Sequence, residues 1–208
     1  MKPARLICVT AVAVSFLLNM SAPLPSQEIS ATTSKHHHYK FIDIGTFGGP
    51  ASFINNVFAF GAPNQINVSG LAVGSSGTSD STPADSTGFV CGGVDGSLPF
   101  VFHAFKWQDG DVTDLGALPG DGNCSIATSI NSRGEIVGQS EIDVDDPLFG
   151  LREVRAVLWK DGNITNLGTF GGRYSVVGSI NNHEQISGLA TNSIADPFSL
   201  LYQIVGSS

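Results

Sequence analysis

The chain reads HAFKWQDGDVTDLGALPGDGNCSIATSINSRGEIVGQS at residues 103–140 and RAVLWKDGNITNLGTFGGRYSVVGSINNHEQISGLA at residues 155–190. The second stretch keeps the order of the first: an aromatic segment, an Asp-Gly pair, a Leu-Gly segment and a turn that begins with asparagine. A looser third copy lies upstream, in FIDIGTFGGPAS at 41–52 and INVSGLAVGSS at 66–76. Recurrence at a spacing of roughly 50 residues is typical of arrays built from one repeated supersecondary unit.

Each unit contains four short apolar segments separated by turn signals. The segments of the two clear units lie at 101–107, 112–118, 126–130 and 135–140, and at 155–159, 164–170, 176–180 and 185–190. Asp109-Gly110 and Asp161-Gly162 favour tight hairpins after the first segment, because both residue types tolerate a positive φ. Since no helical periodicity accompanies these segments, the sequence predicts four antiparallel strands per unit.

Repeated four-stranded units predict an all-β fold arranged as a β-propeller-like array, with a β-sandwich of the same hairpins as the alternative. Propellers have about four to eight blades, and the sequence holds fewer units than that. We therefore expect an incomplete array: a fragment, a truncated product, or a chain that completes itself by association. The expected boundaries are a partial unit at 39–102, a unit at 103–154 and a truncated unit at 155–208, with loop insertions at 77–99 and 141–153.

The N-terminus has the layout of a secretory signal peptide. Lys2 and Arg5 precede an apolar run at 6–18 that is too short to span a bilayer, and small and turn-forming residues follow it. We therefore expect a secreted protein, extracellular or periplasmic. The expected boundaries are a signal peptide at 1–26, a flexible linker at 27–38 and the β-repeat domain at 39–208.

The composition excludes several classes of protein and partner. Charged residues make up 13% of the chain and apolar residues 41%, which is too uncharged for a coiled coil and too apolar for a disordered chain. The formal net charge of −8 disfavours nucleic acid and anionic lipid as partners. No second apolar stretch approaches membrane length, so no membrane span is expected after signal cleavage.

Two cysteines, Cys91 and Cys124, follow the signal peptide. Cysteines of exported chains can pair, and such a disulfide would stabilise the fold by roughly 3 to 4 kcal/mol. The spacing leaves open whether the two residues lie close enough.

Several positions recur in every unit, which indicates a structural role. Asparagine begins the turn in each copy, and we expect its side chain to bond its own backbone. Glycine inside the following segment suggests a bulge or a close approach of neighbouring strands. Asp43, Asp114 and Asn166 precede an Ile-Gly or Leu-Gly pair, where a side-chain hydrogen bond to the backbone suffices. The recurring asparagines and glycines are Asn67, Asn131, Asn181, Gly74, Gly138 and Gly188.

Trp107 and Trp159 occupy equivalent positions in the two clear units. We expect both side chains to be buried between sheets with their indole N–H groups hydrogen-bonded. A stacking platform for a sugar is the alternative interpretation.

No cofactor, metal site or catalytic residue is assigned from the sequence. The weak metal candidates are Asp143, Asp145 and Asp146, which could ligate calcium but lack EF-hand spacing, so a solvated acidic loop is expected. A triplet at residues 36–38 has imidazole ligands but lies in the expected linker. His103 is replaced by Arg155 in the next unit, which argues against a shared catalytic role, and no nucleophile elbow, HExxH motif or phosphate loop is present.

These motifs resemble the bacterial HAF-repeat proteins, a family named for the tripeptide that stands here as His103-Ala104-Phe105. The segments that carry the resemblance are HAFKW (103–107), TDLGALPG (113–120), INSRGEIVG (130–138), RAVLW (155–159), TNLGTFGG (165–172) and INNHEQISG (180–188). The second copy departs from the tripeptide, since it reads Arg155-Ala156-Val157. The resemblance implies a secreted or cell-surface bacterial protein and carries over no active-site residue.

The sequence therefore favours a non-enzymatic, secreted β-repeat protein that binds a cell-surface or extracellular glycan or protein through its loops. One alternative is an extracellular enzyme acting on polysaccharide, with its site on the insertions 77–99 and 141–153; fold analogy alone supports it. Another is a truncated repeat array with no independent function.

Overall fold

The computed structural model describes residues 39–54, 64–81, 90, 100–147 and 150–194, and its strands all belong to the compact unit Ile42–Ser208. The described residues contain ten strands and no helix, which confirms the predicted all-β class. The strands are β1 (Gly48–Phe53), β2 (Ala72–Ser81), β3 (Phe100–Gln108), β4 (Asp111–Gly116), β5 (Ser125–Ile130), β6 (Ile136–Asp145), β7 (Arg152–Lys160), β8 (Asn163–Asn166), β9 (Gly171–Ile180) and β10 (Ile186–Asn192).

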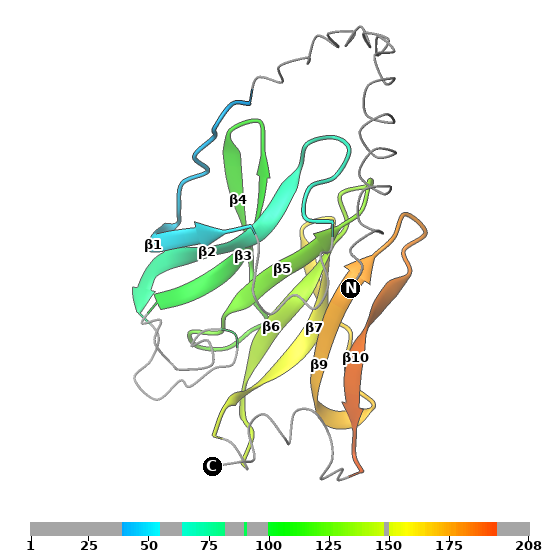
Figure 1. Cartoon of the computed structure of the whole chain (residues 1–208). Coiled ribbons are helices and arrows are strands. Elements are labelled where there is room, and N and C mark those ends of the chain that lie inside the picture. Colours follow the sequence, from blue (N-terminus) through cyan, green and yellow to red (C-terminus); the bar gives the residue numbers. More distant parts are fainter. Residues whose placement is uncertain (1–38, 55–63, 82–89, 91–99, 148–149, 195–208) are drawn as a thin grey trace, which may run out of the picture. The chain divides into compact units, whose positions relative to one another are not determined.

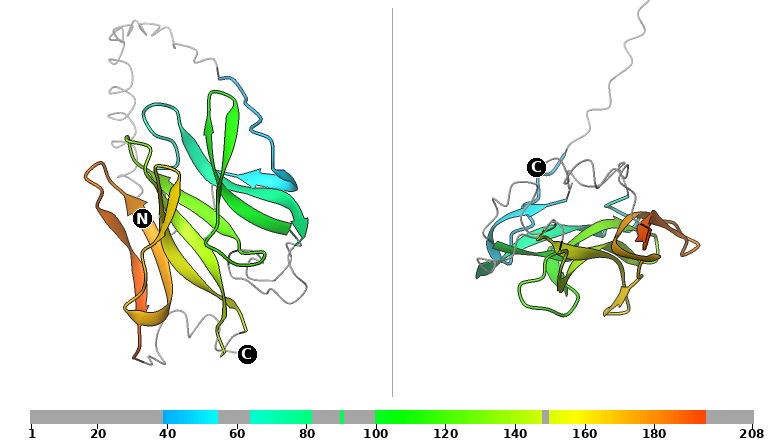
Figure 2. Two further views of the ribbon diagram at one scale, coloured as in Figure 1. Left: turned by 180° about the vertical axis from the view of Figure 1, so that it is seen from behind. Right: turned by 90° about the horizontal axis from the view of Figure 1, so that it is seen from below.

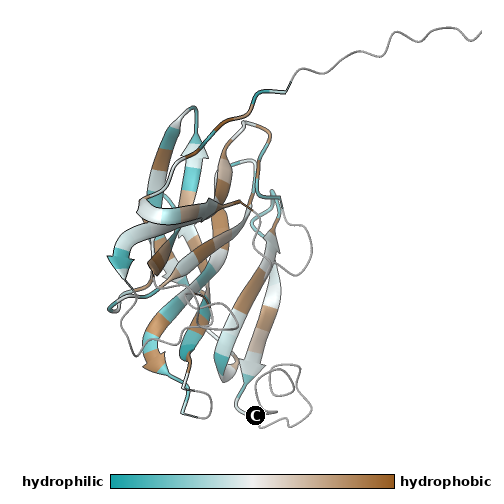
Figure 3. Ribbon diagram, turned by 60° about the vertical axis from the view of Figure 1, so that its left-hand side comes forward, coloured by the Kyte–Doolittle hydropathy of each residue, from teal (hydrophilic) through white to brown (hydrophobic). Residues whose placement is uncertain are grey.

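The strands form three small antiparallel sheets, each with its strands in chain order. The orders are β1-β2-β3-β4, β5-β6-β7-β8 and β9-β10. In Figure 1 the β5–β8 sheet lies between the other two, and the reverse view in Figure 2 shows the same order. Polar and apolar residues alternate along the strands (Figure 3), and apolar side chains fill the space between neighbouring sheets.

Sheet boundaries fall inside the sequence repeat. The aromatic and Leu-Gly segments of the unit 103–154 form β3 and β4 of the first sheet, whereas its last two segments form β5 and β6 of the second. The Asp-Gly turns at 109–110 and 161–162 have positive φ at both residues and keep their strands in one sheet, whereas the chain after the Leu-Gly pair crosses to the next sheet.

The two insertions are not simply loops. Strand β2 continues to Ser81, and β6 runs to Asp145 before β7 begins at Arg152, so the insertion 141–153 forms the end of a long hairpin. Its strand pairing skips between Glu141 and Asp145, which marks a bulge or irregularity. The expectation of a loop is wrong for these parts of the insertions because the added residues extend existing strands.

The asparagine turns have the same geometry three times. In each, the side-chain Oδ1 accepts the backbone N–H groups two and four residues later, at 2.9 to 3.0 Å. The residues concerned are Asn67, Asn131 and Asn181. The Asn131 and Asn181 turns connect the first strand of their sheet to its second strand. The Asn67 turn directly precedes β2, the second strand of the first sheet.

The strand glycines allow the first two strands of each sheet to approach closely. A Cβ atom would lie 2.1 Å from the Phe53 carbonyl oxygen at Gly74, 1.9 Å from that of Ile126 at Gly138, and 2.3 Å from that of Val176 at Gly188. No side chain fits there, so these positions require glycine for space.

Successive sheets are also joined by a serine that does not stand out in the sequence. The Ser125 hydroxyl accepts from the Ala104 N–H (2.8 Å) and donates to the Gly116 carbonyl (2.7 Å), and the Ser175 hydroxyl accepts from the Ala156 N–H (2.9 Å). The bonds from Ala104 and Ala156 join the third strand of one sheet to the first strand of the next, and the bond to Gly116 adds a contact with the end of β4.

Candidate functional site

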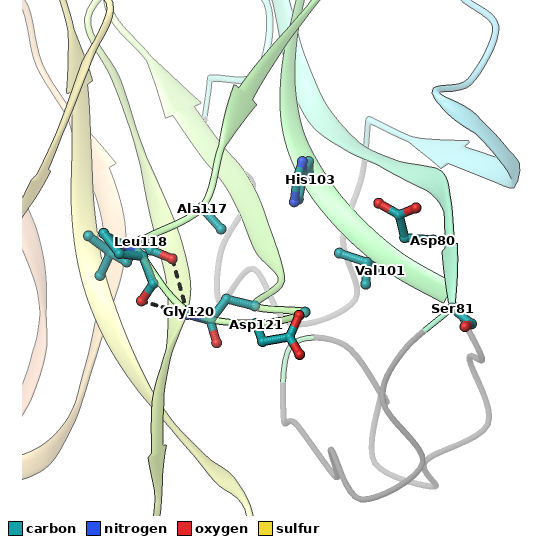
Figure 4. A pocket seen from close by; sticks show the side chains of 11 residues that line it. Asp80, Ser81, Val101, His103, Ala117, Leu118, Gly120 and Asp121 are labelled. Atoms are coloured by element: carbon teal, nitrogen blue, oxygen red, sulfur yellow. Dashed lines mark hydrogen bonds between the residues drawn. The ribbon is translucent and has the colours of Figure 1, made fainter.

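A pocket of about 370 Å³ opens beside the first sheet, within the size range of small-molecule sites. Three segments surround it: the end of β2, the first half of β3, and the loop from β4 to β5 (Figure 4). Its lining residues are Asp80, Ser81, Val101, His103, Ala117, Leu118, Pro119, Gly120, Asp121, Gly122 and Asn123.

His103 is held in this pocket by Asp114. The His103 Nδ1 lies 2.8 Å from the Asp114 Oδ2, and the Asp114 Oδ1 accepts the Gly116 N–H at 2.7 Å. Burial opposes ionisation of Asp114, but the hydrogen bonds from His103 and Gly116 outweigh it, and the pKa of the carboxyl is lower than usual. Because a carboxylate only accepts, the shared proton is on Nδ1, which leaves Nε2 as the other hydrogen-bonding atom of the ring.

This pair is particular to one unit. The next unit has Arg155 in place of His103 and Asn166 in place of Asp114, and Arg155 instead bonds Glu153 at 2.6 Å. The Asx turn itself persists, because the Asn166 Oδ1 accepts the Gly168 N–H at 2.8 Å. His103 and Asp114 are both replaced in the next unit, and this joint replacement is the sequence signal for their contact. Considered separately, Asp114 is predicted only as a turn residue and His103 only as a histidine without a shared role.

The loop between β4 and β5 is fixed by buried polar contacts. The Asn123 side-chain amide donates to the carbonyls of Leu118 (3.0 Å) and Pro119 (3.1 Å). The Arg152 guanidinium reaches over from β7 and donates to the Asp121 carbonyl and the Asn123 Oδ1, both at 2.5 Å. Gly120 has φ +153° and no room for a side chain against Asn123, so the loop is preorganised around this one conformation.

The pocket presents two carboxylates from different segments. Figure 4 shows the side chains of Asp80 and Asp121 around the same opening as His103. Neither carboxylate has a hydrogen bond or ion pair with another described residue. Carboxylates suit a ligand that carries hydroxyl or cationic groups, and they repel an anion.

Ser81 also lines the pocket, but strand register separates it from His103. Ser81 lies opposite Phe100 in the β2–β3 ladder, whereas His103 lies opposite Ser76. The two side chains share no hydrogen bond among those of the described residues.

None of the three acidic candidates of the second insertion is a lining residue of the pocket, although a Cβ atom at the lining residue Gly120 would lie 2.8 Å from the Asp143 Cβ. Asp143 is exposed and 3.5 Å from Arg152, and Asp145 is exposed. Asp146 is instead buried, 3.8 Å from Arg173, so the expectation of a solvated loop is wrong for this residue. The reason is the long hairpin, where the Asp146 N–H donates to the Leu151 carbonyl at 2.8 Å and the chain turns inward.

Within the described ranges, no group of three or more histidine, cysteine or acidic side chains is placed to hold a metal ion. The histidines at 36–38 lie outside those ranges.

Tyr174 lies beside the β6–β7 hairpin. Burial, followed by the charge of Asp146, raises the pKa of its phenol, which favours the neutral form.

The two tryptophans differ in environment. Trp159 is buried, with only 4% of its surface exposed, which excludes it as a stacking platform for sugar. Its indole N–H has no hydrogen-bond partner among the described residues, so the expected bond is not found there; the ring packs in the apolar cluster with Ile136 and Val157. Trp107 is only partly buried, near the Asp-Gly turn.

Cys124 is disulfide-bonded and buried at the start of the second sheet. Cys91 lies outside the described residues, so its pairing with Cys124 stays a prediction. The neighbouring Val90 is described: its N–H donates to the Glu141 carboxylate at 2.8 Å, and the same carboxylate accepts the Cys124 N–H at 3.2 Å.

Comparisons of the chain with protein-family models, with curated proteins and with solved structures found no match. The resemblance to HAF-repeat proteins therefore stays a prediction. Among the residues that the structure describes, no helix is long and apolar enough to cross a membrane.

Proposed function

We propose that this chain is a secreted, non-enzymatic β-repeat protein whose sheets stack as part of a propeller-like array, and that its pocket binds a neutral, hydroxyl-rich ligand such as an extracellular glycan. The observation that carries the proposal is the pocket itself, with the Asp80 and Asp121 carboxylates and the oriented His103 around one opening. Sugar hydroxyls donate to carboxylates and to an imidazole nitrogen, and a neutral ligand avoids repulsion by a chain of net charge −8.

The propeller-like stacking is supported by repetition of the contacts between sheets. Strand β5 packs on β2 and β3, and β9 packs on β6 and β7, with the serine bond repeated at both junctions. A β-sandwich of two facing sheets would not repeat one junction along the chain.

A screen of the purified chain against a glycan array tests the binding function. Binding of neutral oligosaccharides, weakened when Asp121→Asn is introduced and unchanged in Asp161→Asn, is the expected result. Asp161 is the matched control, since it is an acidic residue in an exposed hairpin turn away from the pocket lining. Absence of binding to any neutral glycan would contradict the proposal.

An enzyme acting on polysaccharide is the second candidate, because paired carboxylates are the groups that glycosidases use. Asp80 and Asp121 supply two such groups in one pocket. Incubation of every bound glycan with the chain, followed by product analysis, separates the two functions: intact glycan is expected, and turnover abolished by Asp80→Asn or Asp121→Asn would establish the enzyme instead.

A further inference from the structure

The asparagine turns form a hydrogen-bonded ladder that runs from sheet to sheet. The Asn67 side-chain amide donates to the Asn131 carbonyl at 3.1 Å, and the Asn131 amide donates to the Asn181 carbonyl at 3.2 Å. Each junction therefore joins an amide donor on one sheet to a carbonyl acceptor on the next.

The ladder has one open donor and one open acceptor among the described residues. The Asn181 amide donates to the Gln185 Oε1 within its own turn at 2.7 Å, as the Asn131 amide does to the Glu135 carboxylate, but no carbonyl of a following turn in the described ranges accepts its second N–H. Within the described ranges the Asn67 carbonyl accepts only the Gly70 N–H of its own turn, at 3.0 Å, whereas the Asn131 and Asn181 carbonyls also accept an amide from the preceding turn. The two ends of the ladder are thus complementary.

The acceptor end leaves an apolar repeat position uncovered. Ile66, the residue before the first asparagine, is 59% exposed. The equivalent Ile130 and Ile180 are 1% and 4% exposed, and both belong to sheets that pack on a preceding sheet. Ile66 has the same place in the turn, but no preceding sheet covers it in the described part of the chain.

At the donor end, β10 also exposes an apolar residue at a repeat position that is buried in the other two sheets. Leu189 is 68% exposed, whereas the equivalent Ser75 on β2 and Gln139 on β6 are 4% and 5% exposed. Strands β2 and β6 each contact the first strand of the following sheet. Leucine is thus found at the one copy of this position that no following sheet covers in the described structure.

We propose that a second copy of this chain covers these surfaces: β1 and the Asn67 turn of one copy dock on β10 and the Asn181 turn of the other, repeating the asparagine contact present at both junctions within the chain. The donor and acceptor ends match each other, so a second copy supplies the missing partner of both. Such a contact is heterologous and closes only if the rotation per sheet completes a circle. Two copies of three sheets each give a six-sheet ring, within the usual range for propellers.

The proposal rests on the stacking of the sheets and not on the ligand. Failure of glycan binding leaves it standing, and a monomeric chain leaves the pocket proposal standing.

Sedimentation equilibrium of the full chain over a hundred-fold concentration range tests the association. We expect twice the chain mass, with dimer affinity reduced at least ten-fold by Ile66→Asp and by Leu189→Asp. Val144→Asp, at an exposed apolar residue on the β6–β7 hairpin, is the matched control and should dimerise as the wild type does. All three substituted side chains are exposed in the single chain, and equal thermal melts measured under monomeric conditions verify folding.

Mixing the two variants distinguishes head-to-tail contact from a symmetric one. In a mixed pair, one junction combines the unchanged donor end (Asn181 and β10) of the Ile66→Asp chain with the unchanged acceptor end (Asn67 and Ile66) of the Leu189→Asp chain. Mixing should therefore restore dimers that neither variant forms alone. A monomeric wild type, a larger open polymer, normal dimers of either variant, or no restoration on mixing would each overturn the two-copy ring.

Discussion

At the scale of single residues, the repeat marks positions where the backbone leaves no choice of side chain. Gly138 is the clearest case, because the neighbouring strand's Ile126 carbonyl occupies the space of a Cβ atom. Gly178, in β9, differs: a Cβ there meets only the Ser187 residue, at an ordinary 3.4 Å from its hydroxyl.

Gly138→Ala should therefore lower the free energy of unfolding by roughly 2 to 4 kcal/mol, because the β5–β6 pair must separate to admit the methyl group. Gly178→Ala, the matched control, should change it by less than about 1 kcal/mol. Urea denaturation followed by fluorescence measures both. Equal stability of the two variants would contradict the close-approach explanation.

The sequence predicts residue roles well where recurrence isolates them. The asparagine turns and strand glycines follow from their spacing and their known backbone preferences. The His103–Asp114 contact does not, because a covarying pair is visible only when both positions are compared across units. Burial of Asp146 cannot be predicted from the sequence either, because it depends on how far β6 extends and on Arg173, which is distant in the sequence.

At the scale of elements, a charged cluster joins the turn regions of the second and third sheets. The Glu135 carboxylate accepts from Lys160 (2.6 Å) and Arg133 (3.2 Å), and Arg133 also contacts Glu184 at 2.9 Å. Burial of Glu135 opposes ionisation, but the hydrogen bonds from Lys160 and Asn131 and the charge of Arg133 lower its pKa to about 2.

A carboxyl whose pKa falls on folding stabilises the fold above its unfolded pKa and loses that contribution as the pH falls. For Glu135 the pKa window runs from the ordinary value of 4.5 down to about 2. Glu135→Gln should thus lower the melting temperature by several degrees at about pH 6, with the difference from wild type shrinking toward about pH 2.5. A pH-independent difference would show that packing of this side chain, and not its charge, stabilises the junction.

The strands themselves are predictable from the sequence, but their assignment to sheets is not. Apolar segments and Asp-Gly turns mark β3 to β8 in the sequence, yet no local signal says that the chain changes sheet after the Leu-Gly pair. That step depends on contacts such as the Ser125 hydroxyl with the Ala104 N–H, between residues 21 positions apart.

At the scale of the whole molecule, stacked sheets create the pocket. The strands of the first sheet supply Asp80 and His103, the loop to the second sheet supplies Asp121, and Arg152 of the second sheet fixes that loop. The sequence predicts a binding role for the loops without locating a site, because these segments are brought together only by the order of the sheets.

Isothermal titration of one array-positive oligosaccharide tests most directly whether the pocket carboxylates bind a hydroxyl-rich ligand. Wild type and Asp161→Asn should bind with equal affinity, whereas Asp80→Asn combined with Asp121→Asn should weaken binding at least ten-fold, since each lost acceptor contributes about 1 kcal/mol or more. Unchanged affinity in the double variant, with its fold intact by thermal melting, would contradict the assignment of this pocket as the binding site.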